Sequence, residues 1–228
     1  MASQATDRAT KVLVVLNPKS GSFTAQDVRA AIERHFPCED GTCSVLDLSR
    51  DVDLAATVRE AVAGGVDLVI AAGGDGTVSA VANILTGTPT PMGIIPLGTA
   101  NVLARALGVP VDLEGACALL AGPYATASID AMQVGERIYL TQIGIGIDAL
   151  MIRDTKNEDK RRFGRAAYLW TAFVRFLGFK ARRFSLAVDE QRTRPRATQV
   201  VLANVGTLGQ PPFQWGPDIH LDDGRIDV

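Results

Sequence analysis

Short apolar runs alternate along the first half of the chain with longer segments whose apolar residues recur at helical spacing. The runs predict buried strands at Lys11 to Leu16, Ser44 to Leu48, Val66 to Ala72 and Met92 to Ile95. The helical segments are residues 25–36, 54–63, the stretch from Val78 to Leu85, 102–107 and 112–121. Strands that alternate with helices in this way predict an α/β fold with a parallel sheet.

The pattern changes after Gly122-Pro123. Ala127 to Val134 and Arg137 to Ile143 alternate apolar and polar residues around Gly135-Glu136, which predicts an antiparallel hairpin. Further strands are predicted at Phe184 to Val188 and Gln199 to Val205, and a last one begins after the turn at 222–224. We therefore expect a disordered tail at 1–10, an α/β lobe at 11–122 and a β-rich lobe at 123–228. Because the last strand has hardly begun when the chain stops, the second lobe is expected to be truncated at its C-terminus.

Composition and charge exclude several classes of protein. The chain is 47% hydrophobic and 21% charged, as in ordinary globular domains, and its net charge of -2 gives no general case for binding nucleic acid. Three cysteines without C-x-x-C spacing suggest neither a disulfide framework nor a zinc site. No signal peptide is recognisable, and no apolar run approaches the roughly 18 residues of a membrane span. We expect a cytoplasmic protein that can touch a membrane peripherally without crossing it.

One segment is strongly basic. Between Arg153 and Arg183 there are ten Lys or Arg residues and three acidic ones, interleaved with aromatic residues, and a helix is predicted over roughly Gly164 to Phe179. Two interpretations stay open. Such a helix is often a solvated face over a core. It is equally compatible with an interfacial helix that rests on anionic lipid.

Three predicted strands end in loops rich in Gly with Ser, Thr or Asn, at residues 17–21, 73–77 and 96–101. In a parallel sheet these ends lie on one edge, where glycine backbones and helix N-termini bind phosphate. Asp75 is unusual there, because a carboxylate repels phosphate unless a cation or a hydroxyl lies between them. Metal or proton chemistry is therefore its predicted use. Neither G-x-x-x-x-G-K-[ST] nor a helix-opening G-x-G-x-x-G after the first strand is present.

The three loops, Asn-Pro-Lys-Ser-Gly, Gly-Gly-Asp-Gly-Thr and Pro-Leu-Gly-Thr-Ala-Asn, resemble in order and separation the catalytic domain of diacylglycerol kinases and related sphingosine and ceramide kinases. The resemblance continues through Asp130, 144–146, 160–168, Asn204 and 217–227. NAD kinases and phosphofructokinases share the second loop, but the third loop favours the lipid kinases. The resemblance implies a NAD kinase/diacylglycerol kinase-like fold, with an α/β nucleotide-binding lobe and a sandwich-like β lobe.

The resemblance also implies roles for particular residues. Asp75 would be catalytic, at the point where phosphates, metal and acceptor hydroxyl meet. Mg²⁺ would be held near the turn at 222–224 by the carboxylate of Asp223 and by backbone oxygens of His220 and Arg225, although a plain β-turn explains the same residues. The residues implied to bind ATP are Asn17, Pro18, Lys19, Ser20, Gly21, Ser49, Gly73, Gly74, Asp75, Gly76, Thr77, Val78, Ser79, Ala80 and Thr99.

This chain departs from the family pattern in several places, among them residues 210–215, where Gly-rich residues are partly replaced. Ser79 and Ala80 stand where Asn and Glu are usual, and Val102 stands where Asp is usual. Family members also continue for some tens of residues, which carry an acidic residue proposed as general base.

The expected function is ATP-dependent phosphorylation of a diacylglycerol-like lipid at a membrane surface, in phospholipid biosynthesis, with a homodimer left open. Two alternatives remain: a catalytically impaired remnant that binds nucleotide or lipid, and a kinase of a soluble acceptor such as NAD.

Overall fold

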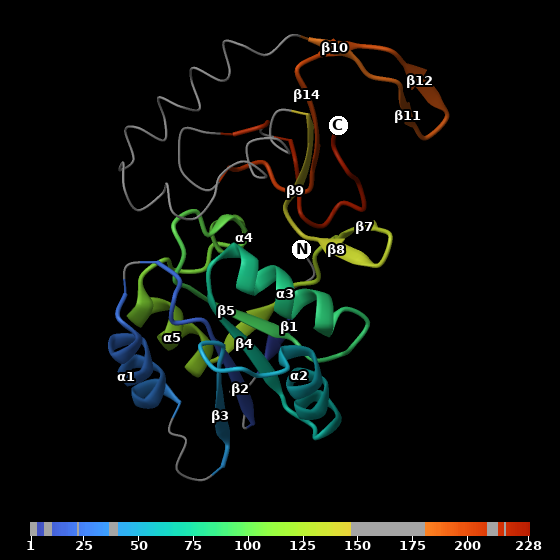
Figure 1. Cartoon of the computed structure of the whole chain (residues 1–228). Coiled ribbons are helices and arrows are strands. Elements are labelled where there is room, and N and C mark those ends of the chain that lie inside the picture. The colour runs from blue at the N-terminus through green and yellow to red at the C-terminus, as the bar shows by residue number, and fades with distance from the viewer. Residues whose placement is uncertain are drawn as a thin grey trace. The chain divides into compact units, whose positions relative to one another are not determined.

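The computed structural model describes residues 4–6, 11–21, 23–36, 41–146, 181–208, 214–216 and 218–228 (Figure 1). The chain divides into two compact units, Met1–Thr141 with Asn204–Arg225 and Gln142–Ala203 with Ile226–Val228. The predicted helix at 164–179 lies outside the described residues. In the part of the chain that is described, no helix has the length and apolarity needed to cross a membrane.

The first unit is built on a four-stranded sheet with the order β3-β2-β4-β5. Its strands are β2 (Val12–Leu16), β3 (Cys43–Asp47), β4 (Leu68–Gly73) and β5 (Met92–Pro96), and all of them run parallel. Every residue of β2 and β4 is buried, as expected for central strands covered on both faces. The predicted parallel α/β lobe is confirmed.

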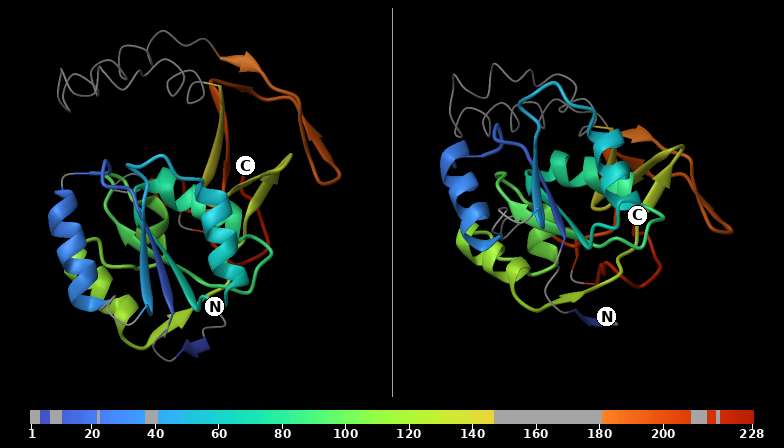
Figure 2. Two further views of the ribbon diagram at one scale, coloured as in Figure 1. Left: turned by 60° about the horizontal axis from the view of Figure 1, so that its bottom comes forward. Right: turned by 90° about the horizontal axis from the view of Figure 1, so that it is seen from below.

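Helices cover the two faces of this sheet (Figure 2). The helices α1 (Ala25–His35) and α5 (Leu113–Ala121) pack on one face, and α2 (Leu54–Ala63), α3 (Asp75–Leu85) and α4 (Val102–Ala106) pack on the other. Successive strand residues alternate between the two cores: Val14 packs with α1 and α5, and Val15 packs with α2 and α3. This alternation explains why the strands are continuous apolar runs.

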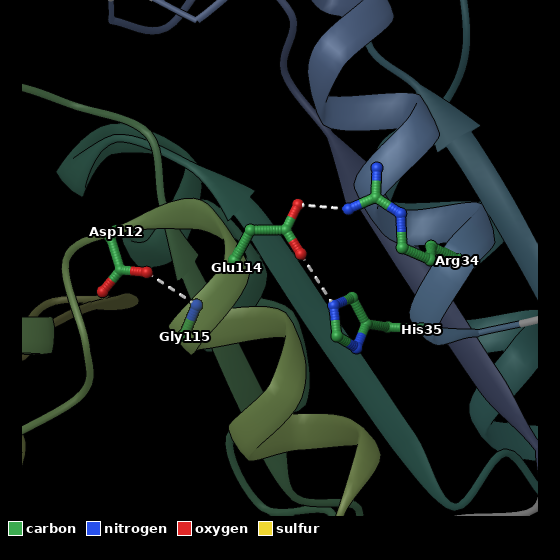
Figure 3. A network of polar contacts seen from close by, with 5 residues as sticks. All are labelled: Arg34, His35, Asp112, Glu114 and Gly115. Atoms are coloured by element: carbon green, nitrogen blue, oxygen red, sulfur yellow. Dashed lines mark hydrogen bonds and ion pairs between the residues drawn. The ribbon is translucent and has the colours of Figure 1, made fainter.

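The end of α1 is joined to the start of α5 by a polar network (Figure 3). The carboxylate of Glu114 accepts a hydrogen bond of 2.6 Å from Arg34, and it lies 3.0 Å from Nε2 of His35. Asp112 caps α5 by accepting a 2.7 Å bond from the N–H of Gly115. Hydrogen bonding to His35, and to a smaller extent to Arg34, holds the pKa of Glu114 below its ordinary value.

Replacing Glu114 with glutamine is therefore expected to lower the melting temperature more at about pH 6 than at about pH 3. A depressed pKa contributes stability above the ordinary Glu value of 4.5, and that contribution disappears as the pH falls through the lower pKa of the folded state. Thermal denaturation at both pH values measures the effect. Glu33→Gln, an exposed neighbour on α1, is the control. Equal shifts for the two variants at both pH values contradict the prediction.

Two short pairs of strands complete the first unit. Strand β1 (Gln4–Thr6) pairs antiparallel with β6 (Tyr124–Thr126), so part of the expected disordered tail is a strand held by backbone pairing. Strands β7 (Met132–Val134) and β8 (Arg137–Tyr139) form the predicted hairpin with shorter strands.

This hairpin is fastened to α3 by Asn83. Its Nδ2 donates a 2.8 Å bond to the carbonyl of Ile138, and its Oδ1 accepts a 2.7 Å bond from the N–H of Ile138. The first unit therefore continues to Thr141, beyond the boundary expected at residue 122.

All regular secondary structure in the described part of the second unit consists of strands. Strands β9 (Gln142–Gly146) and β14 (Gln199–Ala203) pair antiparallel, and Ala203 also bridges to Asp227. The remaining strands are β10 (Arg182–Arg183), β11 (Leu186–Val188), β12 (Gln191–Thr193) and β13 (Arg196–Ala197). The predicted β-rich character is confirmed, but β12 and β13 were not predicted, because Gln-Arg-Thr-Arg-Pro-Arg has no apolar alternation.

Candidate functional site

The structure brings the three glycine loops together at the carboxyl edge of the sheet. Asn17, directly after β2, donates a 3.1 Å bond through Nδ2 to the hydroxyl of Thr77 on α3. Its Oδ1 accepts a 3.2 Å bond from the N–H of Lys19, which shapes the first loop. One side chain thus fixes the first loop and connects it to the second.

The backbones of the loops touch at positions that admit only glycine. A Cβ on Gly21 would lie 1.6 Å from the carbonyl oxygen of Leu97, and a Cβ on Gly98 would lie 2.7 Å from the Cα of Gly74. Gly21 also has a φ of 76°, in the left-handed region that glycine adopts without strain. Close packing of main chain on main chain therefore holds the three loops as one surface.

The helix α3 begins at this surface without a side-chain cap. Gly74 is its N-cap, and its carbonyl accepts bonds of 2.9 and 3.1 Å from the N–H groups of Thr77 and Val78. Within the described part of the chain, the N–H groups of Asp75 and Gly76 have no acceptor. Unsatisfied N–H groups and the helix dipole make such an N-terminus a site for phosphate.

Asp75 links this helix to the third loop. Its Oδ1 accepts a 2.7 Å bond from the N–H of Val102, and its Oδ2 accepts a 3.1 Å bond from the N–H of Asn101. These are the first N–H groups of α4, so the carboxylate caps that helix from outside. Each oxygen keeps a further lone pair for a cation or a hydroxyl.

Asn101 was not predicted as a site residue, yet it shapes the third loop. It is 6% exposed and adopts a left-handed conformation with φ 48° and ψ 49°. Its Nδ2 donates a 2.8 Å bond to the carbonyl of Gly98. Its Oδ1 is buried and has no hydrogen-bond partner among the described residues. The only signal in the sequence was its place at the end of the third loop.

Ser49 joins the same edge from β3. The N–H of Leu48 donates a 2.9 Å bond to the carbonyl of Leu16, which places Ser49 beside the first loop. Asp47 accepts a 2.8 Å hydrogen bond from the N–H of Ser49 and pairs with Arg29. The pKa of Asp47 is lowered mainly by the side chain of Ser49, then by the N–H of Ser49 and by the charge of Arg29. These effects outweigh burial, which raises it. Asp47 was missed, although an Asp two residues before a Ser at a strand end is a turn signal.

The other predicted nucleotide residues divide into accessible and buried ones. Pro18, Lys19 and Ser20 lie on the first loop, and Thr99 is exposed on the third. Val78 is buried in the second core. The carbonyl of Ser79 accepts a 2.9 Å bond from Asn83. Ala80 is exposed one turn after Gly76 on the same face of α3.

Val102 contributes its backbone N–H to Asp75 while its side chain packs against the second core.

The predicted metal turn is fastened to Asp130, also in the first unit. The N–H of Gly224 donates a 2.7 Å bond to Asp130 Oδ2, and the N–H of Arg225 donates a 3.0 Å bond to Asp223 Oδ1. Two carboxylates therefore meet at one turn, anchored by buried Leu221. Oxygen donors suit Mg²⁺. No cluster of three or more His, Cys, Asp or Glu occurs in the described ranges, so a cation here would need backbone oxygens, as predicted for His220 and Arg225.

Comparison with protein families divides the chain in two. Residues 11–134 match the diacylglycerol kinase catalytic domain, and residues 141–228 match the YegS C-terminal NAD kinase beta sandwich-like domain. A Pseudomonas aeruginosa protein described as "probable lipid kinase YegS-like" is 31% identical to this chain over 221 residues. The matched region is 96% of this chain and 71% of that protein. The uncharacterized protein sll0036 of Synechocystis is 27% identical over 94% of this chain. The chain spans about half of that relative, 52% of its length.

Solved structures of diacylglycerol kinases resemble this chain in fold. The crystal structure of a putative diacylglycerol kinase from Bacillus anthracis superposes with a TM-score of 0.74 at 26% identity, over 97% of this chain and 74% of that one. Another diacylglycerol kinase crystal structure from the same organism gives a TM-score of 0.70 at 27% identity, over 97% and 73% of the two chains.

Proposed function

We propose, because the chain belongs to the diacylglycerol kinase catalytic-domain family, that it transfers the γ-phosphoryl group of ATP to the hydroxyl of a diacylglycerol-like lipid. The lipid oxygen forms a bond to the γ-phosphorus as the bond to the bridging oxygen of ADP breaks, and the hydroxyl proton is released. The observation that carries the proposal is the start of α3, where the N–H groups of Asp75 and Gly76, which no described residue accepts from, lie among three packed glycine loops.

Each part of this surface has a separate task in such a reaction. The N–H groups at the start of α3 hold phosphate oxygens, and Asn17 and Gly21 keep the first loop beside them. Asp75 fixes the third loop and keeps lone pairs toward the reacting groups. Mg²⁺, when bound, supplies neutralisation of phosphate charge. We propose in addition that Asp223 and the backbone oxygens of His220 and Arg225 would hold a structural Mg²⁺. The enzyme would act on its lipid at the cytoplasmic surface of a membrane.

Radiolabelled ATP with Mg²⁺ and a panel of diacylglycerol, sphingosine, ceramide and NAD tests the proposal. The expected result is label in the diacylglycerol product. Label in NAD contradicts the lipid acceptor and supports the soluble one. ATP binding without transfer to any acceptor supports the impaired remnant, which Ala80 and Val102 would then explain.

A further inference from the structure

The residues from Arg182 to Ala197 form one antiparallel hairpin, drawn in orange in Figure 1. Arg183 lies opposite Arg196 and Ala187 lies opposite Arg192, so the register is the same in both paired parts. Between them the N–H of Phe184 donates a 3.0 Å bond to the carbonyl of Pro195. Proline cannot return this bond, which explains the interruption of the strands without a change of register.

A continuous register gives the hairpin two different faces, because opposite residues share a face and successive residues alternate. One face carries four arginines, separated only by Ser185 and Ala187, and all of these side chains are exposed. The other face carries partly buried apolar residues such as Phe184 and Leu186. The four arginines, called the arginine face below, are Arg183, Arg192, Arg194 and Arg196.

The arginine face holds positive charge that the described residues do not neutralise. Arg183 and Arg196 are direct cross-strand partners, an arrangement of like charges that destabilises a strand pair. None of the four makes an ion pair or hydrogen bond with another described residue through its side chain. Arg29 and Arg34 of the first unit, in contrast, each pair with a carboxylate. The hairpin is therefore suited to an external partner that supplies several anionic groups.

We propose that the arginine face is a docking surface for the anionic headgroups of a phospholipid bilayer. Guanidinium groups bind phosphate and carboxylate in bidentate geometry, and basic residues near an anionic bilayer strengthen binding. Nucleic acid is a poorer fit, because Ser185 and Ala187 offer no aromatic ring for a base to stack on. The inference rests on the proposed function only in that a lipid kinase must reach its substrate in a membrane.

Vesicle binding by two triple variants tests the proposal. The first variant is Arg183→Gln with Arg194→Gln and Arg196→Gln. The control, Arg59→Gln with Arg137→Gln and Arg182→Gln, removes the same charge from exposed positions outside the arginine face. The probes are vesicles of phosphatidylcholine with phosphatidylserine, and vesicles of phosphatidylcholine alone. Each arginine is expected to contribute roughly fivefold to affinity, so the first variant binds the anionic vesicles roughly 100-fold more weakly than the control.

Several outcomes overturn the proposal: equal affinities of the two variants for anionic vesicles, equally tight binding of the natural chain to phosphatidylcholine alone, or arginine-dependent binding to an RNA oligonucleotide that is tighter than binding to vesicles. Phosphorylation of a short-chain, water-soluble diacylglycerol is measured in parallel and is expected to be the same for both variants. Its complete absence in the natural chain counts against the proposed function, whereas the vesicle result still decides the docking surface.

Discussion

Replacement of Asp75 by alanine is expected to lower transfer of phosphate from ATP to diacylglycerol by about 10²- to 10³-fold, the order found when a preorganised polar group is removed from an active site. The variant loses the charge at the start of α3. It also loses both acceptors for the N–H groups of Asn101 and Val102, so α4 and the third loop are released. Initial rates with labelled ATP and calorimetric titration with ATP measure the two consequences separately.

Asp75→Asn separates charge from position. Its amide oxygen can still accept one of the two backbone bonds, so ATP binding is expected to be largely kept while transfer stays low. Asp112→Ala is the matched control, because Asp112 also caps a helix through a backbone N–H, at α5. The control is expected to cost about 1 kcal/mol of stability and no activity. Turnover of Asp75→Asn close to that of the natural chain would leave Asp75 with a structural role only.

The second large effect is expected at Gly21. Alanine there places its Cβ 1.6 Å from the carbonyl oxygen of Leu97, so the first and third loops must separate. Loss of the joint surface is expected to weaken ATP binding by at least tenfold, about 1.4 kcal/mol. Calorimetric titration with ATP and Mg²⁺ measures the affinity, and thermal denaturation measures stability.

Gly65→Ala is the control that isolates this steric effect. Gly65 has φ 74°, close to the 76° of Gly21, but a Cβ there meets nothing within 4 Å. Both variants carry the strain of a left-handed alanine, about 1 to 2 kcal/mol. Only Gly21→Ala is expected to lose ATP affinity. Equal affinities of the two variants would mean that contact between the loops does not shape the nucleotide site.

Most of the first unit could be predicted because its signals are local. Strands β2 and β4 are apolar throughout, since helices cover both faces of the sheet, and the helices begin at recognisable caps such as Asp53 and Asp112. The second unit was harder to predict. Strands β12 and β13 are polar and interrupted by Pro195, so only their pairing partners reveal them as strands.

Some residues of the candidate site could also be predicted from the sequence, and others could not. Asn17, the glycines and Asp75 were predicted as site residues because loops rich in Gly, Ser, Thr or Asn stand directly after predicted strands. Asp47, Asn101 and Asp130 were not singled out as site residues. Each acts by a hydrogen bond to backbone or to a neighbouring side chain, as Asp130 does to Gly224, a residue 94 positions away in the sequence. The bond from Gly224 to Asp130 spans too many residues to leave a periodic pattern in a single sequence, whereas Asp47 and Asn101 bond to residues two and three positions away, within turns.

The sequence by itself determined the alternation of strands and helices, the three glycine loops and the carboxylate among them, because periodicity, turn chemistry and parallel strand ends follow from residue type. Only the tertiary structure decided the strand order β3-β2-β4-β5, the bonds of Asp75 to the N–H groups of Asn101 and Val102, and the shared register that gathers four arginines on one face. The physical reason is that pairing and close packing join residues distant in sequence, and the choice of partner depends on the whole assembled unit.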